Sequence, residues 1–205
     1  MPSGWGQEDV STGTSGAWYT RTETHVPDGF PPHSGELLAY FNSAGISTGL
    51  STRMFNSSTF DLSAYNSATI SLWVYHEQGE PSADDRLQVQ VRSGTTWVDA
   101  GDPIPRYNGS TGWERHEIDI SGFTGGTIQM GFVGISASGN DIHIDYIRLE
   151  AENIITDDDD DIVTDDDDDS SSGGSGGGGC NISPWAFPLF LFLLPLMALM
   201  GTGKK

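Results

Sequence analysis

Cysteine is almost absent from this sequence: Cys180 is the only one among 205 residues. A single cysteine excludes an intrachain disulfide bond and any zinc site assembled from several cysteine thiolates. If the protein is exported, the lack of disulfides favours a bacterial source over an animal ectodomain.

Basic residues are scarce as well. Nine lysines and arginines stand against 29 acidic residues, for a formal net charge of −20, and the only two lysines are the last two residues. Residues 1–150 hold 18 acidic residues and seven arginines. Such a surface repels a phosphate backbone, so the composition excludes nucleic acid as a partner and suits a solvated or cation-gathering exterior protein.

The N-terminus lacks a secretion signal. Its first five residues are polar and contain no apolar h-region. Because the C-terminal segment described below indicates export, we expect the true N-terminus to lie upstream of Met1.

Helical periodicity is missing from residues 1–149, where short apolar alternations are separated by Gly, Ser, Asn and Pro. In Leu87–Arg92 apolar and polar residues alternate, which places them on opposite faces of a strand. The pattern predicts an all-β domain over residues 1–150, built as two packed antiparallel sheets. The candidate strands are 17–24, 37–41, 50–55, 69–76, 87–92, 96–99, 114–120, 127–134 and 142–149.

Short motifs follow one another along these strands. In order they are Gly4-Trp5, His33-Ser34-Gly35 before Leu38–Phe41, Phe60–Ser63 before Ala68–Trp73, Arg86–Val91, Thr95–Trp97, Gly112-Trp113 before Ile118–Ser121, and Asp141–Ile147. This succession resembles the MAM-like, choice-of-anchor J jelly rolls of bacterial surface proteins. The chain lacks the cysteines of animal MAM domains, which removes support for animal-type receptor adhesion.

The resemblance implies a lectin-like jelly-roll β-sandwich in which binding is more common than catalysis. It also implies one structural calcium ion held by a carboxylate of the last strand, here Asp145, with acidic residues near the N-terminus. Glu8, Asp9 and Asp28 are the candidate partners, since the first and last strands of a sandwich often neighbour each other. Calcium takes six to eight oxygen ligands. The alternative is that Asp145 is an outward-facing strand residue.

Aromatic residues supply the candidate ligand-binding positions. Trp97 and Trp113 lie near strand edges beside glycines, and Tyr107 lies in a loop between Arg106 and Asn108. Their rings could stack on sugars. Trp73 stands between Leu72 and Val74 and is expected in the core.

No catalytic site is expected. Residues 45–49 match the G-x-S-x-G pattern, but that motif needs a strand-to-helix turn in an α/β sheet, so we interpret it as a turn. The adjacent carboxylates Asp84 and Asp85 lie in a polar loop and do not support a glycosidase. The five histidines show no helical metal-ligand spacing, and His143 is expected on a strand surface, facing away from Ile142 and Ile144.

Residues 151–180 change composition abruptly. Two blocks of five aspartates and a Gly/Ser-rich stretch cannot bury enough apolar surface to fold. We expect a disordered spacer, and loose calcium binding by the aspartates is the alternative to a purely solvated linker.

Residues 181–205 contain an uncharged apolar run from 182 to 200. At about 1.5 Å per helical residue the run covers roughly 28 Å, close to the ~30 Å core of a bilayer, which predicts a transmembrane helix. A buried core helix, the alternative, would show a polar face. The terminal lysines place the C-terminus in the cytoplasm and the rest outside. A tail-anchored cytosolic protein would leave both lysines on the wrong side.

This tail resembles bacterial C-terminal sorting signals. Gly176–Cys180, the apolar run and the two lysines match the three parts of GlyGly-CTERM and MYXO-CTERM signals, and Asp161–Thr164 is similar to the JDVT-CTERM type. The resemblance implies that a membrane-bound sorting protease trims the tail near Gly179 and Cys180. Lipidation of Cys180 is a further hypothesis, and a free thiol is its alternative.

The sequence therefore predicts an exported, membrane-tethered, non-enzymatic adhesion or recognition module of the cell surface. Its expected partners are the membrane, the sorting protease, and a glycan or protein ligand. The alternative is the accessory C-terminal part of a secreted hydrolase, a protease or glycosidase, whose catalytic domain lies upstream.

Overall fold

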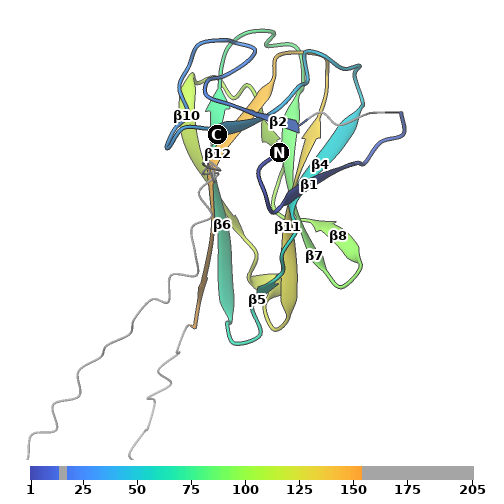
Figure 1. Cartoon of the computed structure of the whole chain (residues 1–205), viewed down its shortest axis with the longest axis vertical. Helices are drawn as coiled ribbons and strands as arrows, with labels where there is room; N and C mark the ends of the chain where they lie inside the picture. The colour runs from blue at the N-terminus through green and yellow to red at the C-terminus, as the bar shows by residue number, and fades with distance from the viewer. Residues whose placement is uncertain (14–17, 154–205) are drawn as a thin grey trace, which may run out of the picture.

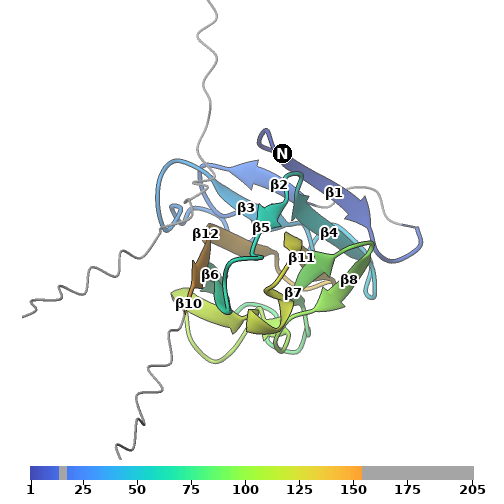
Figure 2. The ribbon, with the colours of Figure 1, turned by 90° about the horizontal axis from the view of Figure 1, so that it is seen from below.

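The computed structural model describes residues 1–13 and 18–153, which form two antiparallel β-sheets packed face to face (Figures 1 and 2). The seven-stranded sheet has the order β1 (Trp5–Asp9), β4 (Ser51–Asn56), β11 (Thr127–Ile135), β7 (Arg86–Ser93) and β8 (Thr96–Asp99), with β5 (Phe60–Asp61) on β11 and β9 (Ile104–Pro105) on β7. The five-stranded sheet has the order β10 (Gly112–Asp119), β6 (Ser67–His76), β12 (Ile142–Glu152), β3 (Leu38–Phe41) and β2 (Trp18–Arg21). The all-β antiparallel sandwich is therefore confirmed.

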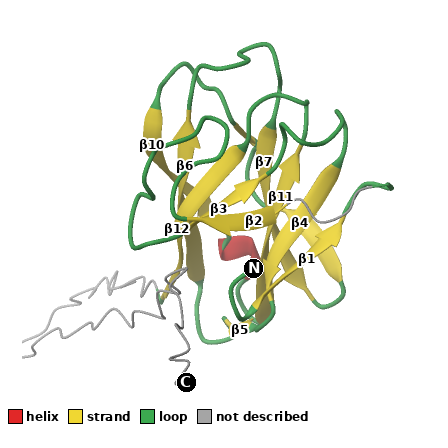
Figure 3. Ribbon diagram, turned by 45° about the horizontal axis from the view of Figure 1, so that its top comes forward, coloured by secondary structure: helices red, strands yellow, loops and turns green. Residues whose placement is uncertain are grey.

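The core lies between the sheets because apolar and polar residues alternate along the strands, as the sequence predicts, which turns the apolar side chains to one face. The core contains three residues of β6 and three of β7, and all six are almost fully buried: Ile70, Leu72, Val74, Leu87, Val89 and Val91. Such interdigitation of two inner faces is the usual core of a β-sandwich. The short 3-10 turn η1 (Ser121–Phe123), drawn in red in Figure 3, contacts β6.

A buried tryptophan links the two sheets. Trp18 of β2 is 1% exposed, and its Nε1–H donates to the carbonyl oxygen of Thr52 in β4 over 2.8 Å. The Trp18 ring also packs on Phe41, with 5.6 Å between ring centroids. This contact joins the layers in a chain that has no disulfide to do so.

All nine predicted strands overlap observed ones. The short strands β1, β5 and β9 were not predicted, because two of them contain only two residues and β1 lacks apolar alternation. The first and last strands are not neighbours: β2, the first predicted strand, lies in the same sheet as β12 but is separated from it by β3, and β1 pairs with β4 in the other sheet.

The last strand extends to Glu152, two residues beyond the predicted domain boundary at residue 150. The predicted linker and sorting motif, the apolar run 182–200, Gly179 and Cys180 lie outside the described residues. Within residues 1–13 and 18–153, no helix has the length and hydropathy needed to cross a bilayer.

Residues 22–37, between β2 and β3, cover the outer face of the five-stranded sheet. The Phe30 ring lies 5.0 Å from that of Tyr75, and His33 stacks on Trp73 with 3.8 Å between centroids. The expectation that Trp73 is a core residue is therefore wrong: it faces away from the core and is half-buried under His33.

Candidate functional site

The outer face of the seven-stranded sheet carries a tryptophan that lies across the strands. In the register, Gly131 of β11 pairs with Phe55 on one side and with Gln90 on the other. A Cβ atom on Gly131 would come within 2.8 Å of the Trp97 ring and 2.9 Å of Arg53 Cδ. The indole of Trp97, which starts from β8, can reach over β11 only because residue 131 has no side chain.

Two arginines flank this indole. The guanidinium carbons of Arg53 and Arg92 lie 4.5 and 4.9 Å from the Trp97 ring centroid, within the range of a cation–π interaction. The Phe55 ring lies 6.0 Å from the same indole. We call Arg53, Phe55, Gln90, Arg92 and Trp97 the aromatic–arginine platform.

Polar contacts hold the platform in place. Arg53 Nε donates to Gln90 Oε1 over 2.7 Å, and Gln90 Nε2 donates to Asp99 Oδ1 over 2.7 Å. Arg53 also forms an ion pair with Glu8. Arg53 is only 8% exposed, whereas Glu8 and Asp99 are exposed and Trp97 is half-buried. The face thus combines accessible aromatic surface with fixed hydrogen-bonding groups, a combination that recognises ligands with both apolar and hydroxyl-bearing sides.

The other two predicted ligand residues lie elsewhere. Trp113 belongs to β10 of the five-stranded sheet, where its Nε1–H donates to the carbonyl oxygen of Pro31 over 3.1 Å and its ring lies 5.4 Å from Tyr75. Tyr107 is half-buried in the segment between β9 and β10. The structure therefore separates Trp97 from Trp113, which lies in the other sheet.

The predicted calcium ligand Asp145 belongs to β12 of the five-stranded sheet. Asp145 is 3% exposed and accepts hydrogen bonds from the backbone N–H groups of Ser34 (2.8 Å) and Tyr146 (2.7 Å). Burial raises the pKa of Asp145, an effect that these hydrogen bonds oppose.

The three candidate partners are engaged in other contacts. Glu8 pairs with Arg53, Asp9 accepts from the Thr52 hydroxyl over 3.3 Å, and Asp28 lies 3.7 Å from Arg21. Glu8 and Asp9 stand on the opposite sheet from Asp145. A calcium ion remains a prediction from the resemblance.

Residues 45–49 lie in the turn region between β3 and β4, as predicted. His143 does face away from Ile142 and Ile144, but it is not a surface residue: it is 0% exposed, and burial lowers its pKa to about 3.

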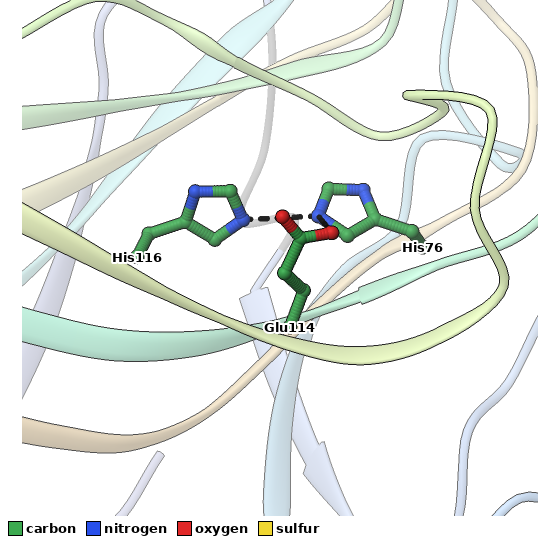
Figure 4. Close-up of side chains that lie close together, drawn as sticks. All are labelled: His76, Glu114 and His116. Carbon is green, nitrogen blue, oxygen red and sulfur yellow. Dashed lines mark hydrogen bonds and ion pairs between the residues drawn. The ribbon is translucent and has the colours of Figure 1, made fainter.

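A histidine–carboxylate cluster occupies the edge of the five-stranded sheet (Figure 4). His76 ends β6, and its register partner is Gly112 at the start of β10. Glu114 and His116 follow on β10 at alternate positions, so they share a face. Nε2 of His76 lies 3.0 Å from Nε2 of His116 and 3.9 Å from Oε2 of Glu114.

Neighbouring groups orient the cluster. His76 is 0% exposed, and its Nδ1 lies 2.9 Å from the carbonyl oxygen of Arg106. Glu114 is exposed, and its Oε2 accepts from Asn108 Nδ2 over 2.9 Å and from Ser110 Oγ over 3.3 Å. The hydrogen bond from Asn108 lowers the pKa of Glu114, and burial lowers the pKa of both histidines.

The cluster does not have the helical spacing that the sequence prediction of metal ligands required, so it was not predicted. Glu114 and His116 show the i, i+2 spacing of two ligands on one strand face, which was a detectable signal. The third member, His76, is 38 residues upstream of Glu114 and joins them only through the β6–β10 pairing.

Comparison with known proteins places the fold. No family model matches the chain, and no curated protein matches it. The K1 cleaved adhesin domain of Lys-gingipain from Porphyromonas gingivalis W83 is similar in structure, with a TM-score of 0.50 and 16% identity over 75% of this chain and 94% of that domain. This likeness supports the jelly-roll β-sandwich and nothing finer.

Two carbohydrate-binding modules are also similar. TmCBM61, solved in complex with β-1,4-galactotriose, has a TM-score of 0.49 and 17% identity over 73% of this chain and 90% of that one. The family 11 module from Clostridium thermocellum, in complex with a β-1,3-1,4-mixed-linked tetrasaccharide, has a TM-score of 0.43 and 12% identity over 74% and 89%.

Proposed function

We propose that this protein is a non-catalytic binding module that recognises a glycan on the aromatic–arginine platform. The observation that carries the proposal is the half-buried indole of Trp97, which lies across the sheet over Gly131 and next to the guanidinium groups of Arg53 and Arg92. The C–H face of a sugar ring can stack on an indole, while its hydroxyl groups need fixed donors and acceptors at the rim of the ring.

The rim of the platform supplies these groups. Gln90 and Asp99 are already positioned by their mutual hydrogen bond, and the Arg92 guanidinium is a multiple donor beside the ring. The outer face of the other sheet offers less room, because Phe30 and His33 of residues 22–37 pack on it. This contrast favours the platform over Trp113 as the glycan site.

The proposal includes the cellular setting. We propose a MAM-like, choice-of-anchor J module at the surface of a bacterial cell envelope, exported and tethered by a membrane helix at residues 182–200, with a sorting signal that a protease processes near Cys180. The net charge of −20, the uncharged apolar run and the two terminal lysines support this setting.

A glycan array probed with the full-length chain tests the ligand. We expect binding to at least one glycan, and we expect Trp97→Ala to reduce the affinity for it at least tenfold. Tyr19→Ala is the matched control, because Tyr19 is an aromatic residue of β2, 44% exposed, on the other sheet. Absence of binding across the array, or equal losses in both variants, would contradict the proposal.

Membrane fractionation tests the tether separately. The full-length chain is expected in the membrane fraction after detergent-free lysis, and deletion of residues 182–205 is expected to release it. An epitope near Met1 should be accessible from outside the cell. A full-length chain found in the aqueous fraction would refute the tether and leave the glycan proposal standing.

A further inference from the structure

We propose that His76, Glu114 and His116 form a binding site for one divalent transition-metal ion of the zinc type. The three side chains are the one group among the described residues in which at least three potential ligand atoms lie within 4.8 Å of one another. The site lies on the five-stranded sheet, while the aromatic–arginine platform belongs to the outer face of the other sheet, so the two proposals are independent.

The tautomer of His76 prepares it to bind a metal. A backbone carbonyl oxygen only accepts hydrogen bonds, so the contact between Nδ1 and the Arg106 carbonyl assigns the ring proton to Nδ1. In the neutral ring the lone pair is then on Nε2, which points at His116. A metal-ligating histidine typically donates its second ring N–H to a carbonyl or carboxylate in this way.

The distance between the two rings fits a shared ion. Two nitrogens bound to one tetrahedral zinc at about 2.0–2.1 Å are roughly 3.3 Å apart. The Nε2 atoms of His76 and His116 are 3.0 Å apart, so a few tenths of an ångström of movement would seat an ion between them. Without an ion, one ring must donate a proton to the other.

The carboxylate completes the donor set from the same strand. Glu114 alternates with His116 on β10, and Asn108 and Ser110 hold its Oε2, which limits the freedom it would lose on binding. Two histidines and one carboxylate make three protein ligands. This number leaves a fourth position of a tetrahedral ion for water or for an external ligand.

The surrounding charges favour a cation. Arg106, whose carbonyl oxygen contacts His76, is a buried cation, but its guanidinium is paired with two carboxylates, Glu77 and Asp85. Adding Glu114 leaves a local excess of negative charge around the ligand atoms. The mixture of imidazole nitrogens with only one carboxylate suits zinc, nickel or cobalt and does not suit calcium, which takes oxygen ligands.

The site is open to solvent on one side. His116 lies at the wall of a shallow groove of about 410 Å³, lined also by Asp102, Ile104 and Pro105. Ions can therefore reach the cluster without unfolding of the sandwich. Since the ligands come from β6 and β10, a bound ion would crosslink the edge strand to its neighbour.

Isothermal titration of the full-length, EDTA-treated chain with zinc chloride tests the proposal. We expect one tight site per chain above any weak background from the acidic tail, which every variant retains. His116→Asn and Glu114→Gln should each weaken this site at least tenfold, while His33→Gln, a histidine change outside the cluster, should leave it unchanged. Circular dichroism of each variant without metal confirms that it is folded.

Two further readouts separate this site from other cation binding. When cobalt(II) replaces zinc, we expect the visible absorption band of a tetrahedral cobalt ion. This band should be absent from the His116→Asn variant. A large excess of calcium chloride should not displace the zinc. Zinc affinity that is unchanged in both ligand variants, or displacement by calcium, would overturn the proposal.

Discussion

Arg106 and Asp85 form an ion pair in which neither side chain is exposed: Nε lies 3.3 Å from Oδ2, and both side chains have 0% relative accessibility. Arg106 also pairs with Glu77, and Asp85 accepts a hydrogen bond from the Ala137 N–H over 2.6 Å and another from the hydroxyl of Ser43. These contacts join segments from four parts of the chain at one end of the sandwich.

Removal of the Arg106 guanidinium should strongly destabilise the fold. Arg106→Leu leaves two buried carboxylates without their cation, and breaking such a pair costs about 3–5 kcal/mol. Urea denaturation measures the loss. Arg115→Leu is the control, because Arg115 is 42% exposed beside Glu117 and an exposed pair is worth roughly 1 kcal/mol or less. Equal losses in the two variants would show that burial does not set the strength of the Arg106 network.

Gly131 should tolerate no side chain. Its alanine variant places a Cβ 2.8 Å from the Trp97 ring, so the indole must move, and such overpacking typically costs about 1–3 kcal/mol. Gly126→Ala is the matched control, since a Cβ there meets nothing within 4 Å. Thermal and urea unfolding of both variants measure the difference. If Gly131→Ala is as stable as Gly126→Ala, the indole is not held against the sheet.

His143 should make stability depend on pH. Burial lowers its pKa to about 3, below the ordinary value near 6.5 that it regains on unfolding. Between about pH 6.5 and 3, His143 is therefore protonated in the unfolded chain and neutral in the folded chain. The stability that the fold has above about pH 6.5 is lost as the pH falls toward 3. The loss approaches, as an order of magnitude, ~5 kcal/mol at the acid limit.

A comparison with His143→Gln isolates this effect. Glutamine can still accept the hydrogen bond that His143 Nε2 receives from the His25 N–H, but it does not titrate. Burial raises the pKa of Asp141 and Asp145, which stabilises the fold as the pH falls, and both carboxyls remain in the variant. Urea unfolding between pH 7 and pH 4 should show a steeper loss for the wild type. Parallel curves would contradict the assignment.

The hydrogen bond from Trp18 that joins the two sheets should contribute more to the free energy of unfolding than the more exposed hydrogen bond of Trp113. Trp18→Phe removes the buried Nε1–H donor to Thr52, at about 1–3 kcal/mol, and leaves space beside Phe41. Trp113→Phe removes the more exposed bond to Pro31 and should cost less than half as much. The free energies of unfolding in urea check this order. A larger loss for Trp113→Phe would reverse the roles we assign to the two indoles.

The sequence alone predicted the strands because burial on one face imposes a period of two. Thr96–Asp99 was predicted with its observed ends, and Leu87–Arg92 differs by one residue at each end. Strand β1 was missed because Trp5–Asp9 has no apolar alternation: it is an edge strand whose pairing with β4 comes from backbone hydrogen bonds. His143 was placed on the correct face, but its burial depends on residues 22–37, which no local pattern reveals.

Composition and periodicity by themselves determined that this chain is an acidic, disulfide-free β-sandwich, because both follow from side-chain chemistry and from the two-residue repeat of a strand. Only the tertiary structure decided that Trp97 lies over Gly131 and that His76 meets His116. Both relationships depend on which strands pair and in what register, and that choice arises from the packing of two whole sheets.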